Sequence, residues 1–486
     1  MHSVRFRFLS ILLCLMICLA ALLGDIYPKY TKITEEETIY EEGTTITVWY
    51  TDPYLEEFIR NAAVVYEEQT GVKVIPSEVS GLEYLEYIQK STIDNDNGPD
   101  VYILNSDSLE KAYLSGLCAT VKDPGQVLNN TYYPTTALNA ISYNDHKLGY
   151  PLMYECSLFV YNKTILDAVA EQYNQDLIDG KNNTDYGEGA QPSESENEGG
   201  IEGDTPEFVT ADDIIPKSIV GIIEFALKYN LTEGVESYFK WCVSDVLYDY
   251  WFAGAYLDVG GVKGDERSEI NLYSEESIYC LEVFQDFKQF FSMEIDETSY
   301  DDVLKEFEEG KALFIVGDTD IIKELETSKK EEEGFKDEYG VASIGMLNDN
   351  LQSKSLSITK LAAVNGFSEN PEVAEDFAKF ISFDYSENLY SRTGKMACRK
   401  QYEYAYPQME DVMRTYENSV SLPKIVETSN FWVLVEMVYT KTWDGDNANY
   451  LLRQLSSQVK KQVYEITVDE EQIDTPEIVE DYIMEE

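Results

Sequence analysis

Short apolar segments alternate with amphipathic ones over the first third of the chain, and this alternation limits the fold most. Thr44–Tyr50 alternates as a strand does, and Leu55–Thr70 has apolar residues at helical spacing. Further strands are predicted at Val72–Ile75 and Pro99–Leu104, with helices at 82–92 and 106–115. Strands that alternate with helices in this way indicate an α/β lobe built on a parallel sheet.

The pattern continues along the rest of the chain with two interruptions. Helices are predicted at 211–229, 236–252, 274–293, 299–309, 371–383, 430–440 and 448–463, and strands at 310–320, 341–346 and 356–364. Residues 180–207 are rich in Gly, Asn, Ser and Glu, and they bury too little apolar surface to offset their ordering entropy. They predict a disordered acidic insertion, with a cation-binding loop as the alternative, and residues 466–486 predict an acidic, disordered tail.

Length and charge restrict the class of protein. The 486 residues exceed one ordinary domain and suit two, and the net charge is -54, from 37 basic and 91 acidic side chains. Such a surface repels nucleic acid and anionic lipid, which excludes both as partners and favours neutral or cationic ligands.

The cysteine and histidine content indicates neither a metal site nor a full disulfide framework. The seven cysteines show no C-x-x-C spacing, and the five outside the N-terminal segment are predicted to be small buried hydrophobes. With only two histidines, a mechanism that needs a His base or a His-rich metal site is disfavoured. No cofactor and no metal is expected.

The N-terminus predicts export. Arg5 and Arg7 precede an uncharged apolar run from Phe8 to Gly24, so residues 1–24 form either a cleaved signal peptide or an uncleaved membrane anchor. Neither Cys14, which follows Leu13, nor Cys18, which follows Ile17, has the small preceding residue that lipidation requires. Residues 25–43 predict an acidic stalk, and the remaining chain is expected on the outer face of the cell membrane, tethered or secreted.

Gly149–Lys163 holds a carboxylate between two extended segments. Tyr150–Pro151 ends the first segment, Ser157–Tyr161 is a short apolar strand, and Glu155 lies between them beside a tyrosine. Glu155 is predicted to be a polar anchor in a cleft, and a solvent-facing side chain in a strand connection is the alternative.

Aromatic and acidic side chains also gather after the other predicted strands. Carbohydrate is bound by rings that stack on its apolar face and by carboxylates and amides that bind its hydroxyls, at the carboxyl ends of strands. The candidate ligand-binding residues are Trp49, Tyr50, Asp52, Asn105, Asp107, Glu155, Tyr250, Trp251, Asp318 and Trp432. For each aromatic residue the alternative is a place in the core, and for an acid such as Asp107 it is a helix N-cap.

Residues 44–465 resemble the carbohydrate-type extracellular solute-binding proteins of ABC importers, the relatives of maltose-binding protein. Similar segments, in the family's order, are Thr45–Tyr50, Gly98–Leu104, Gly149–Lys163, Glu308–Gly317, Ser357–Asn365, Asn370–Ile381 and Ser429–Val435. The last segment is similar to the helix whose Trp stacks on sugar, which implies that role for Trp432. One departure is Gly317-Asp-Thr-Asp320, because many relatives carry a Trp there; the ligand is then a sugar or another polyhydroxylated or basic solute.

The resemblance implies a two-lobe α/β fold of the periplasmic-binding-protein type II, joined by hinge crossings. The first lobe would combine 44–152 with 365–418, and the second 153–364 with 419–465. Its function would be capture of a small solute without catalysis, and delivery to the transmembrane subunits of an ABC permease. In that site Trp49, Tyr250, Trp251 and Trp432 would stack, while Asp52, Asn105, Glu155 and Asp318 would form hydrogen bonds.

Two other classes remain open. One is a glycoside hydrolase that uses a carboxylate pair such as Glu155 with Asp318. The other is a membrane-tethered sensor module that presents its ligand to a receptor.

Overall fold

The computed structural model describes residues 40–41, 43–95, 97–179, 208–291, 293 and 298–476. The predicted export segment, most of the predicted stalk, the acidic stretch 180–207 and residues 477–486 of the predicted tail lie outside the described residues. None of the helices in this described part has both the length and the hydropathy that crossing a bilayer requires.

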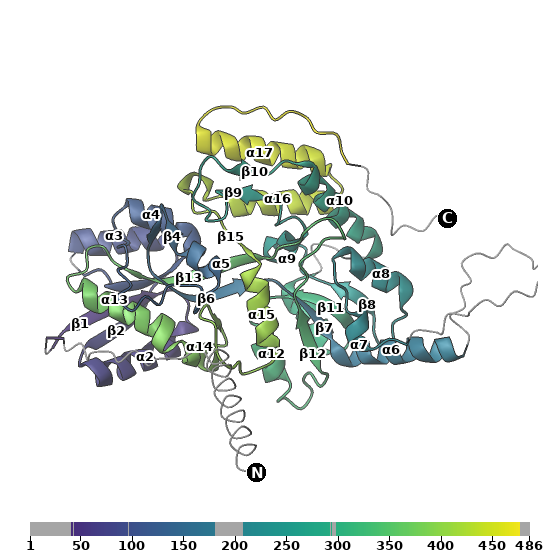
Figure 1. The fold of residues 1–486 in the computed structure, drawn as a ribbon, viewed down its shortest axis with the longest axis horizontal. Coiled ribbons are helices and arrows are strands. Elements are labelled where there is room, and N and C mark those ends of the chain that lie inside the picture. The colour runs from purple at the N-terminus through teal and green to yellow at the C-terminus, as the bar shows by residue number, and fades with distance from the viewer. Residues whose placement is uncertain are drawn as a thin grey trace, which may run out of the picture.

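The larger sheet occupies the left half of Figure 1. Its strands are β1 (Thr45–Tyr50), β2 (Lys73–Glu78), β3 (Val101–Asn105), β6 (Tyr150–Cys156), β13 (Leu356–Val364), β14 (Met396–Ala397) and β15 (Val420–Ser421). The order is β14-β6-β13-β3-β1-β2, and β15 also pairs with β13. As predicted, β1 lies parallel to β2 and β3, whereas β13 runs antiparallel between β3 and β6.

The smaller sheet lies to the right, in the order β12-β7-β11-β8. Its strands are β7 (Leu158–Asn162), β8 (Ser237–Lys240), β11 (Ala312–Gly317) and β12 (Tyr339–Ala342). Every residue of β11 is buried, because this inner strand is covered on both faces, and its sequence is accordingly a continuous apolar run.

The helix predicted at 236–252 is wrong in its first part. This segment begins with β8, which pairs parallel to β11, and only Val246–Asp249 (α9) and the short 3₁₀ turn Tyr250–Phe252 are helical. The apolar run is too short for its periodicity to separate strand from helix. Tertiary pairing decides in favour of the strand, since Phe239 is fully buried opposite Phe314.

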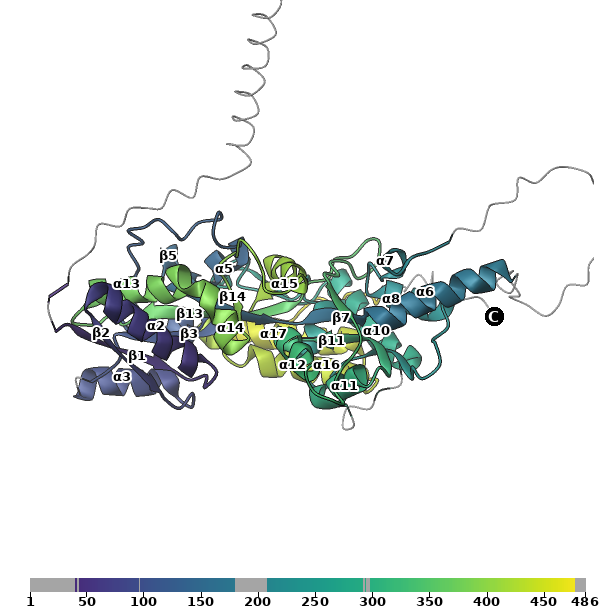
Figure 2. The ribbon, with the colours of Figure 1, turned by 90° about the horizontal axis from the view of Figure 1, so that it is seen from below.

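Helices surround both sheets (Figures 1 and 2). Those near the larger sheet are α2 (Leu55–Thr70), α3 (Tyr84–Asn95), α4 (Leu109–Leu114), α5 (Thr135–Ala140), α13 (Pro371–Lys379), α14 (Leu389–Thr393) and α15 (Gln408–Glu417). Those near the smaller sheet are α6 (Lys163–Ile178), α7 (Ala211–Ile214), α8 (Val220–Lys228), α10 (Glu275–Phe290), α11 (Tyr300–Glu308), α12 (Ile321–Ser328), α16 (Phe431–Trp443) and α17 (Ala448–Tyr464). Two short hairpins, β4–β5 (Ser142–Tyr143, His146–Lys147) and β9–β10 (Asp258–Val259, Ile270–Asn271), complete the fold.

The chain passes from one sheet to the other with almost no connecting loop. Strand β6 ends at Cys156 and β7 begins at Leu158, so a single residue separates the two sheets at this crossing. All of β6 and all of β13 pair within the larger sheet. The larger sheet therefore includes residues 153–156 and 356–364, which the sequence analysis assigned to the second lobe.

Two hydrophobic clusters form the interior. Along β7, Leu158 and Val160 belong to the cluster that includes the larger sheet, whereas Phe159 between them belongs to the cluster under α10, α16 and α17. This separation follows from the two-residue repeat of a strand, which sends neighbouring side chains to opposite faces. The five cysteines of the described residues are buried and carry free thiols, as predicted.

The first part of the predicted disordered tail is ordered against α17, contrary to expectation. Residues 466–476 run along this helix, as the yellow segment above it in Figure 1 shows. Glu470 forms an ion pair of 2.6 Å with Lys460, and the Asn449 side-chain amide donates to the carbonyl oxygen of Ile473 over 2.8 Å. Acidic composition alone gave no sign of these specific partners.

The second cluster generates a test of stability. Trp443 is fully buried, lies edge-on to Trp241 and donates from Nε1 to the carbonyl oxygen of Met293. We expect Trp443→Ala to lower the free energy of unfolding by about 3–5 kcal/mol, because it leaves a large cavity. Tyr450→Ala, at a 61% exposed ring on α17, should change it by less than about 0.5 kcal/mol. Denaturant titration of both variants measures the difference, and equal losses would contradict this packing.

Candidate functional site

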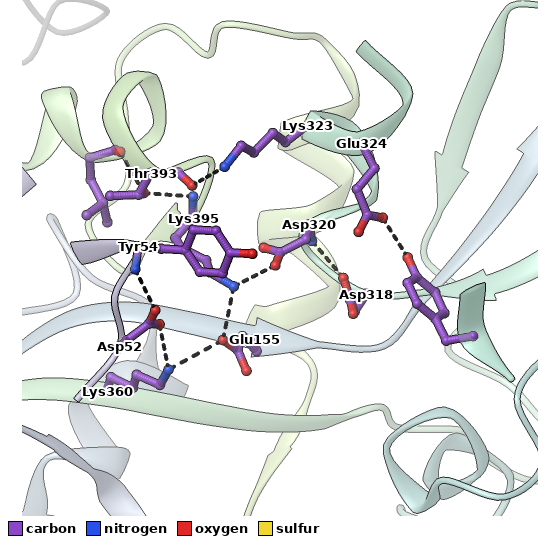
Figure 3. Close-up of polar contacts among 12 residues, drawn as sticks. Asp52, Tyr54, Glu155, Asp318, Asp320, Lys323, Glu324, Lys360, Thr393 and Lys395 are labelled. Carbon is purple, nitrogen blue, oxygen red and sulfur yellow. Dashed lines mark hydrogen bonds and ion pairs between the residues drawn. The ribbon is translucent and has the colours of Figure 1, made fainter. Parts of the chain in front are cut away.

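Charged side chains from both sheets meet at the crossing between them (Figure 3). Asp52 follows β1, Glu155 lies near the end of β6, and Lys360 lies within β13 of the larger sheet. Asp318 and Asp320 follow β11 of the smaller sheet. They meet because the strand ends of the two sheets face each other at the place where the chain crosses.

Local turns fix the two loops that carry the aspartates. After β1, Asp52 Oδ1 accepts from the backbone N–H of Tyr54 over 3.0 Å. After β11, Asp318 Oδ1 accepts from the backbone N–H of Asp320 over 2.8 Å, just before α12 begins at Ile321. Aspartate favours such turns because its short side chain reaches the backbone two residues ahead.

Two lysines link the carboxylates into a chain of alternating charge. Lys360 Nζ lies 3.1 Å from Asp52 and 3.5 Å from Glu155. Lys395 Nζ lies 3.4 Å from Glu155 and 2.5 Å from Asp320. The Lys395 side chain is only 8% exposed, and a buried charge of this kind is tolerated only when it is paired.

Lys395 joins the two sheets directly. It precedes β14, which pairs with β6 of the larger sheet, whereas its partner Asp320 follows β11 of the smaller one. Burial lowers the pKa of Lys395, but the hydrogen bond to Asp320 and the charges of Asp320, Glu155 and Asp52 outweigh this effect and raise the pKa above its usual value. The ammonium group is therefore charged at any physiological pH.

The smaller-sheet side of the site holds two carboxyl groups with raised pKa values. Burial, together with the charge of Asp320, raises the pKa of Asp318 to about 6. Burial, together with the charge of Asp318, raises the pKa of Glu324 on α12 to about 7. Both groups accept a hydrogen bond of 3.0 Å from a tyrosine hydroxyl, Asp318 from Tyr248 and Glu324 from Tyr300. These neutral donors only partly offset the effect of burial.

A cavity of about 420 Å³ opens beside this acidic side. Its lining includes the Tyr54 ring, the carboxylates of Asp320 and Glu324, and the ammonium groups of Lys323 and Lys395. The volume is within the range of small-molecule sites, which run from roughly 300 to 1,000 Å³. Within the described residues, no group of His, Cys, Asp and Glu is arranged to hold a metal ion.

Five of the sequence-predicted polar residues lie at the facing strand ends. Asp52, Glu155 and Asp318 take part in the polar contacts of Figure 3. Asn105 is exposed and lies opposite Lys360 in the β3–β13 ladder. Asp107 is also exposed, and it accepts from the Ser108 hydroxyl over 3.2 Å.

The sequence-predicted aromatic residues lie elsewhere. Trp49 is 9% exposed and stacks on Tyr87 at a centroid distance of 5.1 Å. Tyr50, Tyr250 and Trp251 are buried in the two hydrophobic clusters. Their rings are core residues, so the structure does not bring them to the site.

Trp432 is the one predicted aromatic residue with some exposure. It is half-buried at the start of α16 and packs against the second cluster. The ring that does line the cavity is that of Tyr54, which is 58% exposed and was not predicted.

Sequence reasoning also missed Lys360, Lys395 and Glu324. Lys360 carried a usable signal, because it is the one charged residue of β13. Lys395 and Glu324 carried none, since one follows a short helix and the other lies on an ordinary amphipathic one. Their importance follows only from the approach of segments that are distant in sequence.

Three solved structures resemble this chain. The extracellular solute-binding protein from Staphylococcus aureus in complex with maltose has a TM-score of 0.67 and 17% identity, covering 88% of this chain and 99% of its own. A cyclo/maltodextrin-binding protein complexed with maltotetraose has a TM-score of 0.65 and 17% identity, covering 87% and 98%. The maltotriose-binding protein of Thermus thermophilus, bound with maltotriose, has a TM-score of 0.58 and 16% identity, covering 86% and 100%.

This chain has the fold of the extracellular solute-binding proteins. The agreement extends over nearly the whole length of each solved structure, and it confirms the expected mixed α/β architecture. No protein-family model and no curated protein matches the sequence. At these identities the likeness establishes the fold, and the ligand has to be argued from the site itself.

The raised pKa of Glu324 predicts a pH-dependent stability. Between its ordinary value of 4.5 and its folded value of about 7, the folded protein binds the proton more tightly than the unfolded chain. The free energy of unfolding therefore falls as the pH rises through this window. Glu324→Gln removes the charge and keeps an acceptor for Tyr300. We expect the variant's stability relative to wild type to increase by about 1 kcal/mol from pH 5.5 to pH 8, after allowance for partial exposure.

Urea denaturation at the two pH values measures this difference. Glu171→Gln, which makes the same change of charge at an exposed position of α6, serves as the control and should show no such trend. A Glu324→Gln effect that is equal at both pH values would show that burial does not raise this pKa.

Proposed function

We propose that this protein is an extracytoplasmic solute-binding protein that captures a small polar ligand, a sugar or oligosaccharide, and delivers it to an ABC permease. The observation that carries the proposal is the convergence of Asp52 and Glu155 from one sheet with Asp318 and Asp320 from the other. Carboxylates that accept hydrogen bonds from several directions suit a ligand rich in hydroxyl groups. The solved structures of the same fold, which hold maltose, maltotetraose and maltotriose, support this ligand class.

In this proposal the two sheets with their helices act as two lobes that close on the ligand. The first lobe takes in β6 and β13, and the second begins at β7. The single residue between β6 and β7 and the return through β13 serve as hinge crossings. A ligand that contacts both lobes stabilises the closed state by its extra contacts there, and the permease recognises that state.

The ion pair between Lys395 and Asp320 holds the two lobes together before a ligand binds. It connects the two proposed lobes next to Glu155, which Lys395 also contacts. A ligand hydroxyl can donate to Glu155 or Asp318 and accept from Lys360. The ion pairs of Lys360 with Asp52 and Glu155 can remain in place when it does so. The tethered sensor module of the sequence analysis would use the same closure, with a receptor in place of the permease.

Binding and closure are tested together. We expect maltose or a related oligosaccharide to raise the melting temperature and to reduce the radius of gyration in solution scattering, because ligand binds only the folded, closed state. Glu155→Gln should weaken binding about tenfold or more, since it removes a charged acceptor shared by Lys360 and Lys395. Glu171→Gln should bind as the wild type does.

Product analysis in the same samples separates binding from hydrolysis. The binding function requires that oligosaccharides remain intact after prolonged incubation, whereas release of shorter sugars would assign the protein to the glycoside hydrolases with Glu155 and Asp318 as the carboxylate pair. An unchanged melting temperature and scattering profile across neutral and charged solutes would contradict the proposed function.

A further inference from the structure

The chain's own ammonium groups occupy one wall of the cavity. Lys395 Nζ lies between Asp320, Glu155 and the Tyr54 ring, whose centroid is 5.3 Å away. Lys323 Nζ lies 5.0 Å from the same ring centroid and donates to the carbonyl oxygen of Thr393 over 2.8 Å. Two carboxylates and an aromatic face form a cage of the kind that attracts organic cations. The architecture of this wall therefore already accommodates protonated amines.

The wall of the cavity that carries Glu324 has carboxyl oxygens that lack a cationic partner. Glu324 accepts only from the Tyr300 hydroxyl, and no ion pair in the described part of the chain reaches it or Asp318. Asp320 gives one oxygen to Lys395, while its other oxygen, Oδ1, is buried and accepts no hydrogen bond from any described residue. An acceptor of this kind is costly when it is left unpaired, so the wall is suited to an incoming donor.

Acidic side chains also outnumber basic ones around the cavity. Four carboxylates line it, those of Glu308, Asp320, Glu324 and Glu331, against the two ammonium groups of Lys323 and Lys395. At Glu324, burial raises the pKa, and repulsion by the charges of Asp318, Asp320 and Glu308 raises it further. A positive charge placed in the cavity would relieve this repulsion, whereas a neutral sugar would leave it in place.

We propose that the solute held in this cavity carries a protonated amine, which binds beside Glu324 and Asp320. The inference rests on the proposed function and narrows its ligand to an amine-bearing one, an amino sugar or a short polyamine. Amino sugars combine the hydroxyl groups that suit Glu155 with the positive charge that suits Glu324. Both sources share the ammonium group, and the test separates them.

Titration calorimetry of the full chain at pH 6.5 compares glucosamine, N-acetylglucosamine, spermidine and maltose. Glucosamine and N-acetylglucosamine differ at the amine, which is charged in the first and an uncharged amide in the second. We expect glucosamine or spermidine to bind at least about tenfold more tightly than N-acetylglucosamine and maltose, because only they supply a charge-assisted contact. The preference for glucosamine or for spermidine identifies the source of the amine.

Proton release gives a second readout. Amine binding should release up to about one proton at pH 6.5, since a nearby cation lowers the raised pKa values of Glu324 and Asp318. Repeating the titration in buffers of different ionisation enthalpy counts the protons. Amine affinity should rise from pH 5.5 to pH 7, because the carboxyl groups must ionise to bind the cation.

The variant Glu324→Gln tests whether the Glu324 carboxyl group takes part in amine binding. It should weaken amine binding about tenfold or more and abolish most of the proton release, and the urea denaturation above verifies that it folds. Glu171→Gln should do neither. Tight binding of maltose or N-acetylglucosamine without proton release would overturn this inference and leave the proposed function standing. Failure of all four solutes to bind would count against both.

Discussion

The ammonium group of Lys395 is the contact on which the arrangement of the site depends. It is shared between Glu155 of the larger sheet and Asp320 beyond the smaller one, at a position where its side chain is 8% exposed. Without this cation, three carboxylates from two sheets would approach one another in a partly buried space, and their repulsion would open it. With it, the loops after β1 and β11 are held at the separation that forms the cavity.

Aromatic residues that a carbohydrate site would use for stacking lie in the cores of this chain, and mostly charged and polar residues line its cavity. Trp49 and Trp251 stabilise the two cores, and the acidic turn after β11 faces the cavity instead. In the proposed function, a site built in this way recognises its solute mainly by charge and hydrogen bonds. Its affinity will therefore depend on pH and on salt more than stacking on a ring would.

The sequence predicted the elements of this fold better than their places in it. The alternation from Thr45 to Asn105 gave the parallel strands and their helices, and the apolar run of β11 gave a buried strand. It failed at β8, where Ser237–Lys240 is a strand because a partner strand lies beside it. It also grouped residues 356–364 with the second lobe, because the pairing of Leu361 with Leu104 in the larger sheet cannot be read along the chain.

The sequence by itself determined which residues could be buried and which carboxylates would follow strands, since these depend on composition and on periods of two and 3.6 residues. It thereby placed Asp52 and Asp318 after strands and Glu155 near a strand end, which the structure has at the crossing between the sheets. Only the tertiary structure decided their partners. Lys360 lies 308 residues from Asp52, and Lys395 lies 75 from Asp320. The approach of such groups follows from how two sheets meet, which no local pattern encodes.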